Sequence, residues 1–139
     1  MLSYSALIGA MNAPTQVVLA RRVEQHADPD QVVAALRHMW RHTFTGDTTA
    51  MLTTLIASDW CYLRPELNAA PDPAAGPGQC AVVGVGVTSH APRRQPVNFC
   101  LTEAADVAVD WIYLLDPCTA TIAVHTGDGQ PPATYPLAG

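Results

Sequence analysis

One helical block interrupts a chain that otherwise carries the patterns of β-strands, and this order constrains the fold more than any other feature. Two strand-like runs, 4–10 and 16–23, lie around turn-forming residues at 12–15, so a hairpin is expected. A helix start follows at Asp28-Pro29-Asp30-Gln31, which supplies an N-cap, a first-turn proline, an acid that suits the helix dipole and a capping-box glutamine. With further strand patterns behind the block, the sequence predicts an α+β fold with a mainly antiparallel sheet, and not βαβ repeats.

Two helices are expected in this block, at about 28–42 and 47–57, both packed on one face of the sheet. The first places five apolar residues within an arc of about 120°; they are Val32, Val33, Leu36, Met39 and Trp40. The second begins at Asp47 and has an apolar face made of Met51, Leu52, Leu55 and Ile56. Gly46 suits the connection between the two helices.

The remaining strands are expected at 59–63, 79–88, 97–101, 111–115, 121–125 and 135–138. Asp116-Pro117 favours a type I turn, so the fourth and fifth of these form a hairpin. Proline and glycine predict loops at about 65–78 and 89–96. The 139 residues match the usual size of one domain, so we expect 1–139 to fold as a single globular unit.

A short run occurs twice in the chain. Asp59-Trp60-Cys61-Tyr62-Leu63 and Asp110-Trp111-Ile112-Tyr113-Leu114 agree at four of five positions. Two interpretations are open: a duplicated element that stacks on a ligand, or two strands of one sheet with aromatic residues at alternate positions. The strand pattern favours the second interpretation.

The charge balance excludes several functions. The chain has no lysine, so all seven formal positive charges are arginine, and twelve acidic residues give a net charge of -5. Lysine nucleophiles, Schiff bases and a P-loop are therefore excluded. An acidic chain lacks the basic face that phosphate backbones require, so no nucleic-acid partner is expected.

The beginning of the chain and the cysteines bear on location. The first 20 residues are uncharged, but polar residues and a proline interrupt them, so neither a membrane span nor a signal peptide is expected. The four cysteines lie 18 to 20 residues apart with no Cys-x-x-Cys pair; they are Cys61, Cys80, Cys100 and Cys118. We expect a cytoplasmic protein with reduced cysteines and no membrane contact.

The candidate catalytic residues are Glu24, His26 and Asp28, which cluster where the second strand leads into the first helix. His26 could act as a base oriented by either carboxylate, with Cys61 or Ser89 brought close by folding. The alternative is that the cluster only caps the helix and meets solvent. His38 and His42 share one helix face, but zinc needs three or four converging ligands, so no metal site and no cofactor are expected.

The candidate binding residues are two arginine pairs and a nearby histidine. Arg21 and Arg22 end the second strand, while Arg93 and Arg94 lie with His90 in the proline-bounded loop. Such arginines suit an acidic protein partner or an anion. Gly84-Val85-Gly86 lacks the third glycine and the helix of a dinucleotide loop, so it indicates close packing or a bulge.

The sequence resembles a group of small uncharacterised proteins of high-GC actinobacteria and their phages and mobile elements. The residues that carry the likeness are Ala6-Leu7-Ile8-Gly9, Ala34-Ala35-Leu36 with Trp40-Arg41, Asp47-Thr48-Thr49-Ala50-Met51, Asp59-Trp60 with Tyr62-Leu63, Val83-Gly84-Val85-Gly86, and Trp111-Ile112-Tyr113-Leu114 with Asp116-Pro117. Members often carry His-x-Asp-Gly-Tyr-Pro before the helix, whereas here only Pro29 of that run is kept. The resemblance implies a fold and a type of host, and no activity.

These observations predict a small protein-binding or regulatory module that acts on a host protein. The alternatives are a small enzyme that uses the histidine and acids of the strand–helix junction, or a structural subunit of a homo-oligomer.

Overall fold

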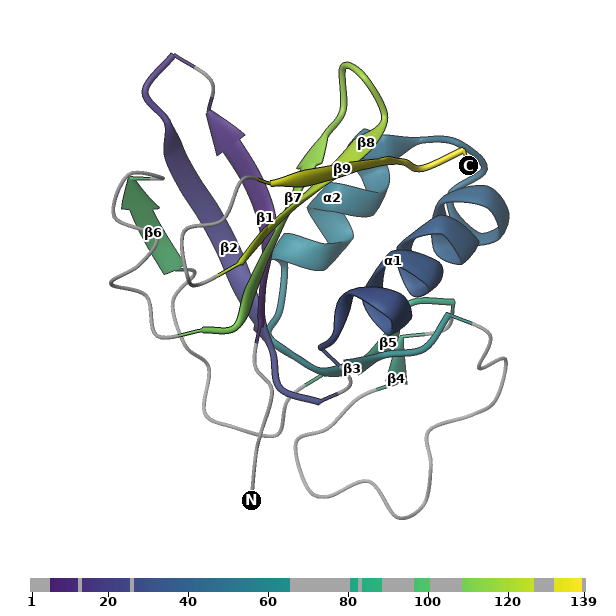
Figure 1. Ribbon diagram of the computed structural model, residues 1–139. Coiled ribbons are helices and arrows are strands. Elements are labelled where there is room, and N and C mark those ends of the chain that lie inside the picture. Colours follow the sequence, from purple (N-terminus) through teal and green to yellow (C-terminus); the bar gives the residue numbers. More distant parts are fainter. Residues whose placement is uncertain are drawn as a thin grey trace.

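The computed structural model describes residues 6–12, 14–25, 27–65, 81–82, 84–88, 97–100, 109–126 and 132–138. Across them the chain forms one mixed sheet of nine strands (Figure 1). In the sequence, the helices lie between the second and the third strand. The strands are β1 (Ala6–Asn12), β2 (Val17–Val23), β3 (Trp60–Leu63), β4 (Ala81–Val82), β5 (Gly86–Thr88), β6 (Val97–Cys100), β7 (Trp111–Asp116), β8 (Thr121–Thr126) and β9 (Ala133–Pro136). The helical elements are α1 (Pro29–His38), the π-helical turn η1 (Met39–Thr43) and α2 (Thr48–Ile56). The predicted α+β class is confirmed.

The strand order is β4-β5-β3-β2-β1-β7-β8-β9, and β6 pairs with β2 outside this path. Only two of the described pairings are parallel, β1 with β7 and β2 with β3, so the sheet is mainly antiparallel as predicted. Both helices lie on one side of the sheet, and β3, β4 and β5 pass beneath α1 in Figure 1. Of the loops predicted at about 65–78 and 89–96, all but residue 65 lie outside the described residues.

The strand predicted at 79–88 is wrong as a single element. The described part of this run forms two short antiparallel strands, β4 and β5, with a turn between them. Gly84 in the turn has a φ of +78°, a conformation that glycine adopts without strain. A side chain at Gly86 would meet the carbonyl oxygen of Tyr62 at 2.4 Å, so this glycine permits close packing on β3, as predicted.

The two Asp-Trp-x-Tyr-Leu runs lie on either side of the β1–β2 hairpin. Ala6 pairs with Val23 across the hairpin, Trp111 of β7 pairs with Ala6, and Trp60 of β3 pairs with Val23. These four residues form one row across the sheet, and β3 and β7 run in opposite directions. All four pack in the core on the helical side, so the runs are equivalent strands of one sheet.

The first helix starts where the sequence predicts and ends earlier. The Asp28 carboxylate accepts a hydrogen bond from the Gln31 backbone N–H at 3.3 Å, and the Gln31 side-chain amide donates to the same carboxylate at 2.8 Å. The α-helix ends at His38, short of the predicted residue 42, because the next turn widens: the Phe44 N–H donates to the Met39 carbonyl five residues back. In this wider turn the Trp40 indole N–H reaches the buried Thr48 hydroxyl at 2.9 Å, which joins η1 to α2.

The core has two parts, one on each face of the sheet. On the helical side, α1 contributes Val32, Val33 and Leu36 of the predicted apolar arc, and η1 contributes Met39. The helix α2 contributes Met51 and Leu55, and the sheet contributes Trp60 and Tyr113 among others. A second cluster, which contains Leu7, Val18 and Ile112, lies on the opposite face. Burial on both faces explains why β1 is apolar at consecutive positions rather than alternate ones.

Candidate functional site

The predicted catalytic cluster has structural roles at two of its three positions. The Asp28 carboxylate caps α1, and the Glu24 backbone N–H donates to the Trp60 carbonyl at 3.0 Å, which extends the pairing of β2 with β3. His26 lies outside the described residues. The structure therefore supports the capping interpretation for Asp28.

Cys61 lies beside this cluster and is poorly suited to nucleophilic chemistry. Its carbonyl accepts a hydrogen bond from the Gln25 N–H at 2.8 Å, and its side chain is buried. Burial raises the pKa of the Cys61 thiol, and the negative charge of Glu24 raises this pKa further. At neutral pH the thiol is therefore protonated, whereas a nucleophilic cysteine needs a lowered pKa.

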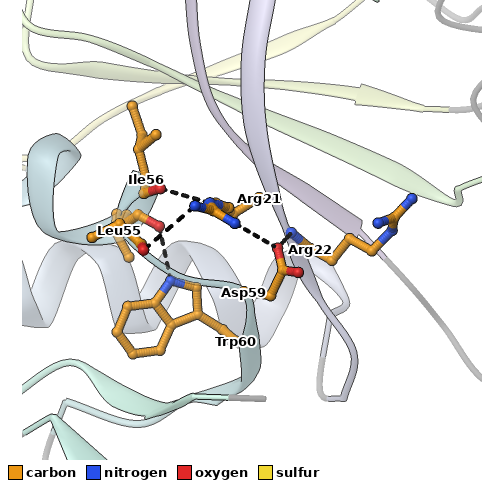
Figure 2. A network of polar contacts seen from close by, with 7 residues as sticks. Arg21, Arg22, Leu55, Ile56, Asp59 and Trp60 are labelled. Carbon is orange, nitrogen blue, oxygen red and sulfur yellow. Dashed lines mark hydrogen bonds and ion pairs between the residues drawn. The ribbon is translucent and has the colours of Figure 1, made fainter. Parts of the chain in front are cut away.

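Arg21 belongs to a network that closes the C-terminus of α2 (Figure 2). Its Nε donates to the Ile56 carbonyl at 2.7 Å and its Nη2 to the Ala57 carbonyl at 3.5 Å, while Nη1 lies 3.8 Å from the Asp59 carboxylate. The Trp60 indole N–H donates to the Leu55 carbonyl at 2.9 Å. Side chains of β2 and β3 thus satisfy the last carbonyl groups of a helix that has no glycine cap.

Arg22 differs from its neighbour. Its backbone N–H donates to the Asp59 carboxylate at 3.1 Å, and its side chain extends away from the network in Figure 2. The other predicted binding residues, His90, Arg93 and Arg94, lie outside the described residues. The binding role of Arg22 and of this loop stays a prediction.

The repeated tryptophans have no shared place for a ligand. Trp60 is only 1% exposed and its indole nitrogen is bonded to α2, whereas Trp111 is half-buried. A ligand could not stack on Trp60 without opening the core. The shared run is explained by strand packing.

His38 and His42 meet on the solvent side of α1 and η1, as their spacing predicts. Both are exposed, and their ring centroids are 4.6 Å apart with the rings inclined at 45°. Within the described ranges, no group of three or more His, Cys, Asp or Glu side chains is arranged to hold a metal ion. Two imidazoles alone fall short of the ligand set of a structural zinc site.

A cleft between α1 and β3 gathers polar side chains that local sequence patterns did not single out as a site. Its volume is about 650 Å³, within the range of small-ligand pockets. The lining residues are Asp30, Gln31, Ala34, Ala35, His38, Tyr62, Leu63 and Arg64. Ala34 and Ala35 are small residues in the middle of the helical wall, so space opens there between the helix and the strand.

The two ends of the cleft are fixed by contacts on either side of it. At one end the Gln25 N–H donates to Cys61 at the start of β3, next to the start of α1. At the other end the Arg64 N–H donates to the Val85 carbonyl, and the adjacent Gly84 carbonyl accepts from the Thr43 hydroxyl at the end of η1. The strand β3 therefore runs in the same direction as α1.

This common direction gives the cleft a charge polarity. Asp30 lies in the first turn of α1, whereas His38 ends the helix and lies on the side of Arg64. Eight residues at 1.5 Å each separate Asp30 and His38 by about 12 Å along the helix axis. That distance is far beyond hydrogen-bond reach, so the acid and the imidazole can bind two separate groups but cannot work as a catalytic pair.

Arg64 is the cation that this cleft has available. Among the five described arginines, Arg21 closes α2, while Arg37 and Arg41 donate to the carbonyl groups of Pro136 and Ala138 at 2.9 and 3.1 Å. Arg64 is exposed and its guanidinium has no hydrogen bond or ion pair to the described part of the chain. The sequence signal that could have identified it is a lone arginine directly after a buried strand and before a proline.

Comparison with known proteins finds no matching family model, no matching curated protein and no matching solved structure. Among the described residues no helix is long and apolar enough to cross a membrane.

Proposed function

We propose that this chain is a small protein-binding module whose binding site is the cleft between α1 and β3. The observation that carries the proposal is the arrangement of that cleft: an acid at one end, a cation at the other and small side chains between them. Complementary charge gives specificity and orientation to a bound segment, whereas general acid–base chemistry needs groups within hydrogen-bond reach of one another.

The outer edge of the sheet supports a partner that binds at the cleft rather than by adding a strand to β9. Pro136 lacks an N–H, and its carbonyl accepts from the Arg37 guanidinium at 2.9 Å. Arg37 also lies 5.9 Å from the centre of the Tyr135 ring, and Leu137 anchors the segment in the core. Proline and charge at an edge strand oppose strand pairing, both with a partner and with a second copy.

The proposal places the module in the cytoplasm, where it acts on a protein of the host. Cys61, Cys100 and Cys118 are unpaired thiols, which suits a reducing compartment. The resemblance to proteins of actinobacteria and their mobile elements suits a partner from such a host.

The test is selection of binding peptides from a displayed random library on the full chain, followed by blocking of the cleft. Ala34 is exposed at the middle of the cleft, so Ala34→Trp fills it without changing charge or the core. The matched control is Thr49→Trp, which places the same side chain on an exposed position of α2 outside the cleft. We expect the selected peptides to lose binding to Ala34→Trp and to keep it with Thr49→Trp. Failure to select any peptide, or binding that survives Ala34→Trp, would overturn the proposal.

A further inference from the structure

We infer that the cleft selects an extended segment with a basic side chain at the Asp30 end and an acidic side chain at the Arg64 end. This inference rests on the proposed function and adds the chemistry and spacing of the partner. It follows from the polarity of the cleft, because each charged group is exposed and lies on the lining.

The acidic end is formed at the start of α1. Asp30 is exposed there, and Asp28 lies close by in the cap of the same helix. Burial raises the pKa of Tyr113, and the negative charges of Asp28 and Asp30 raise this pKa further. The Gln31 side-chain amide donates to Asp28. The carboxylate of Asp30 is therefore the charged acceptor at this end of the cleft lining. A guanidinium or ammonium group is the natural partner for this end.

The basic end combines Arg64 with His38. The Arg64 backbone is held by the Val85 carbonyl at 2.9 Å, so the root of its side chain is fixed while the guanidinium is exposed. His38 lies on the opposite wall and its ring packs against His42. An acidic side chain between the two walls can accept from the imidazole of one wall and the guanidinium of the other.

The separation of the two ends determines the kind of ligand. The span of about 12 Å along α1 from Asp30 to His38 is too long for the two charged groups of a single amino acid, but it corresponds to between three and four residues of extended chain at about 3.3 Å each. Asp30 and His38 both lie on the α1 wall, and side chains of an extended segment alternate between its two sides, so a basic residue that faces Asp30 and an acidic residue that faces His38 are four positions apart. The inferred ligand is therefore a segment with opposite charges at positions i and i+4.

The experiment measures the binding of selected peptides, and of versions with their two charges exchanged, by fluorescence anisotropy. Asp30→Asn and Arg64→Gln should each weaken binding by about two- to fivefold, the range of exposed ion pairs. Asp116→Asn and Arg41→Gln are the matched controls, because they change the same residue types at exposed positions away from the cleft and should leave affinity within about twofold. The double variant Asp30→Arg with Arg64→Glu should reverse the preference and bind the charge-exchanged peptide more tightly than the original.

Each outcome bears on a different claim. Peptides that carry opposite charges four positions apart, together with the reversed preference of the double variant, support the inference. If Ala34→Trp abolishes binding but the peptides share no such spacing, or the double variant keeps the original preference, the inference is overturned and the protein-binding proposal stands. If no peptide depends on the cleft, both fail. Circular dichroism of each variant, with an unchanged unfolding midpoint, distinguishes lost contacts from lost folding.

Discussion

Replacing Arg21 with methionine removes the guanidinium that closes the C-terminus of α2. The side chain is 14% exposed, and it lies on the helical side of the sheet. Methionine keeps an unbranched apolar stem of similar length, so the main loss is polar. The Ile56 carbonyl loses a hydrogen-bond donor at 2.7 Å, and Asp59 loses its ion-pair partner.

The expected magnitude follows from these contacts. A hydrogen bond from a charged donor contributes about 1.5–3 kcal/mol, and the bond to Ile56 is the shortest in the network. The contact with Asp59 at 3.8 Å is long and adds less, since Asp59 keeps the hydrogen bond from the Arg22 N–H. The free energy of unfolding should fall by about 2–3 kcal/mol, which for a chain of this size lowers Tm by about 8–12 °C.

Arg22→Met is the matched control, because it makes the same substitution at the next residue. The Arg22 side chain extends away from the network and its backbone N–H is unaffected by the change, so the expected loss is below about 0.5 kcal/mol. Urea denaturation followed by tryptophan fluorescence measures both variants against the original chain. Equal losses in the two variants, or a larger loss for Arg22→Met, would refute the role assigned to Arg21.

Three further perturbations test other contacts. Tyr113→Phe removes the buried hydroxyl that donates to the Ala27 carbonyl, so the unfolding free energy at pH 7 should fall by about 1–2 kcal/mol. Because burial raises the pKa of Tyr113 in the folded chain, the original protein loses stability as pH rises above the ordinary value of 10.0, and urea titrations up to pH 11 should show a shallower loss for this variant. Burial lowers the pKa of His125 in the folded chain, so the free energy of unfolding falls as pH drops below 6.5. His125→Asn should make this fall shallower in urea titrations from pH 7 to 5. An unchanged fall would exclude the histidine as its source. Gly84→Ala should lower the free energy of unfolding by about 1–3 kcal/mol, because φ at this position is +78° and the new Cβ would lie 2.6 Å from the Thr43 hydroxyl oxygen. Thermal unfolding measures the loss. Adding Thr43→Ala to the same chain should restore part of it, whereas strictly additive losses from the two substitutions would contradict the clash.

Features that depend on a few neighbouring residues were predictable from the sequence. Both helix starts have the expected aspartate caps, with Asp28 bonded to Gln31 and Asp47 accepting from the Ala50 N–H at 3.0 Å. The predicted hairpin of β7 and β8 is present, and at its turn the Asp116 carboxylate accepts from the Cys118 N–H. In each case the signal and the contact lie within three residues of each other.

Features that join distant parts of the chain were not predictable in this way. Arg21 was a candidate for binding because an arginine pair is a visible pattern, yet its partner carbonyls are 35 and 36 residues away. The cleft is similar, since Asp30 and Arg64 meet the same space only after β3 has been placed along α1. The early end of α1 was missed because apolar spacing continues through Met39 and Trp40 whether the turn is α-helical or π-helical.

The place of the β1–β2 hairpin between two parallel partners has a consequence for how the chain folds. The hairpin pairs residues at most 17 positions apart, whereas Ala6 and Trp111 are 105 positions apart and Val23 and Trp60 are 37 apart. Loop closure makes the local pairing fast and the distant pairing slow, so the hairpin forms early and its two edges wait for β3 and then β7. During synthesis on the ribosome, the apolar edge of β1 therefore stays uncovered until the last quarter of the chain has emerged, and that interval is when the nascent protein is most exposed to aggregation.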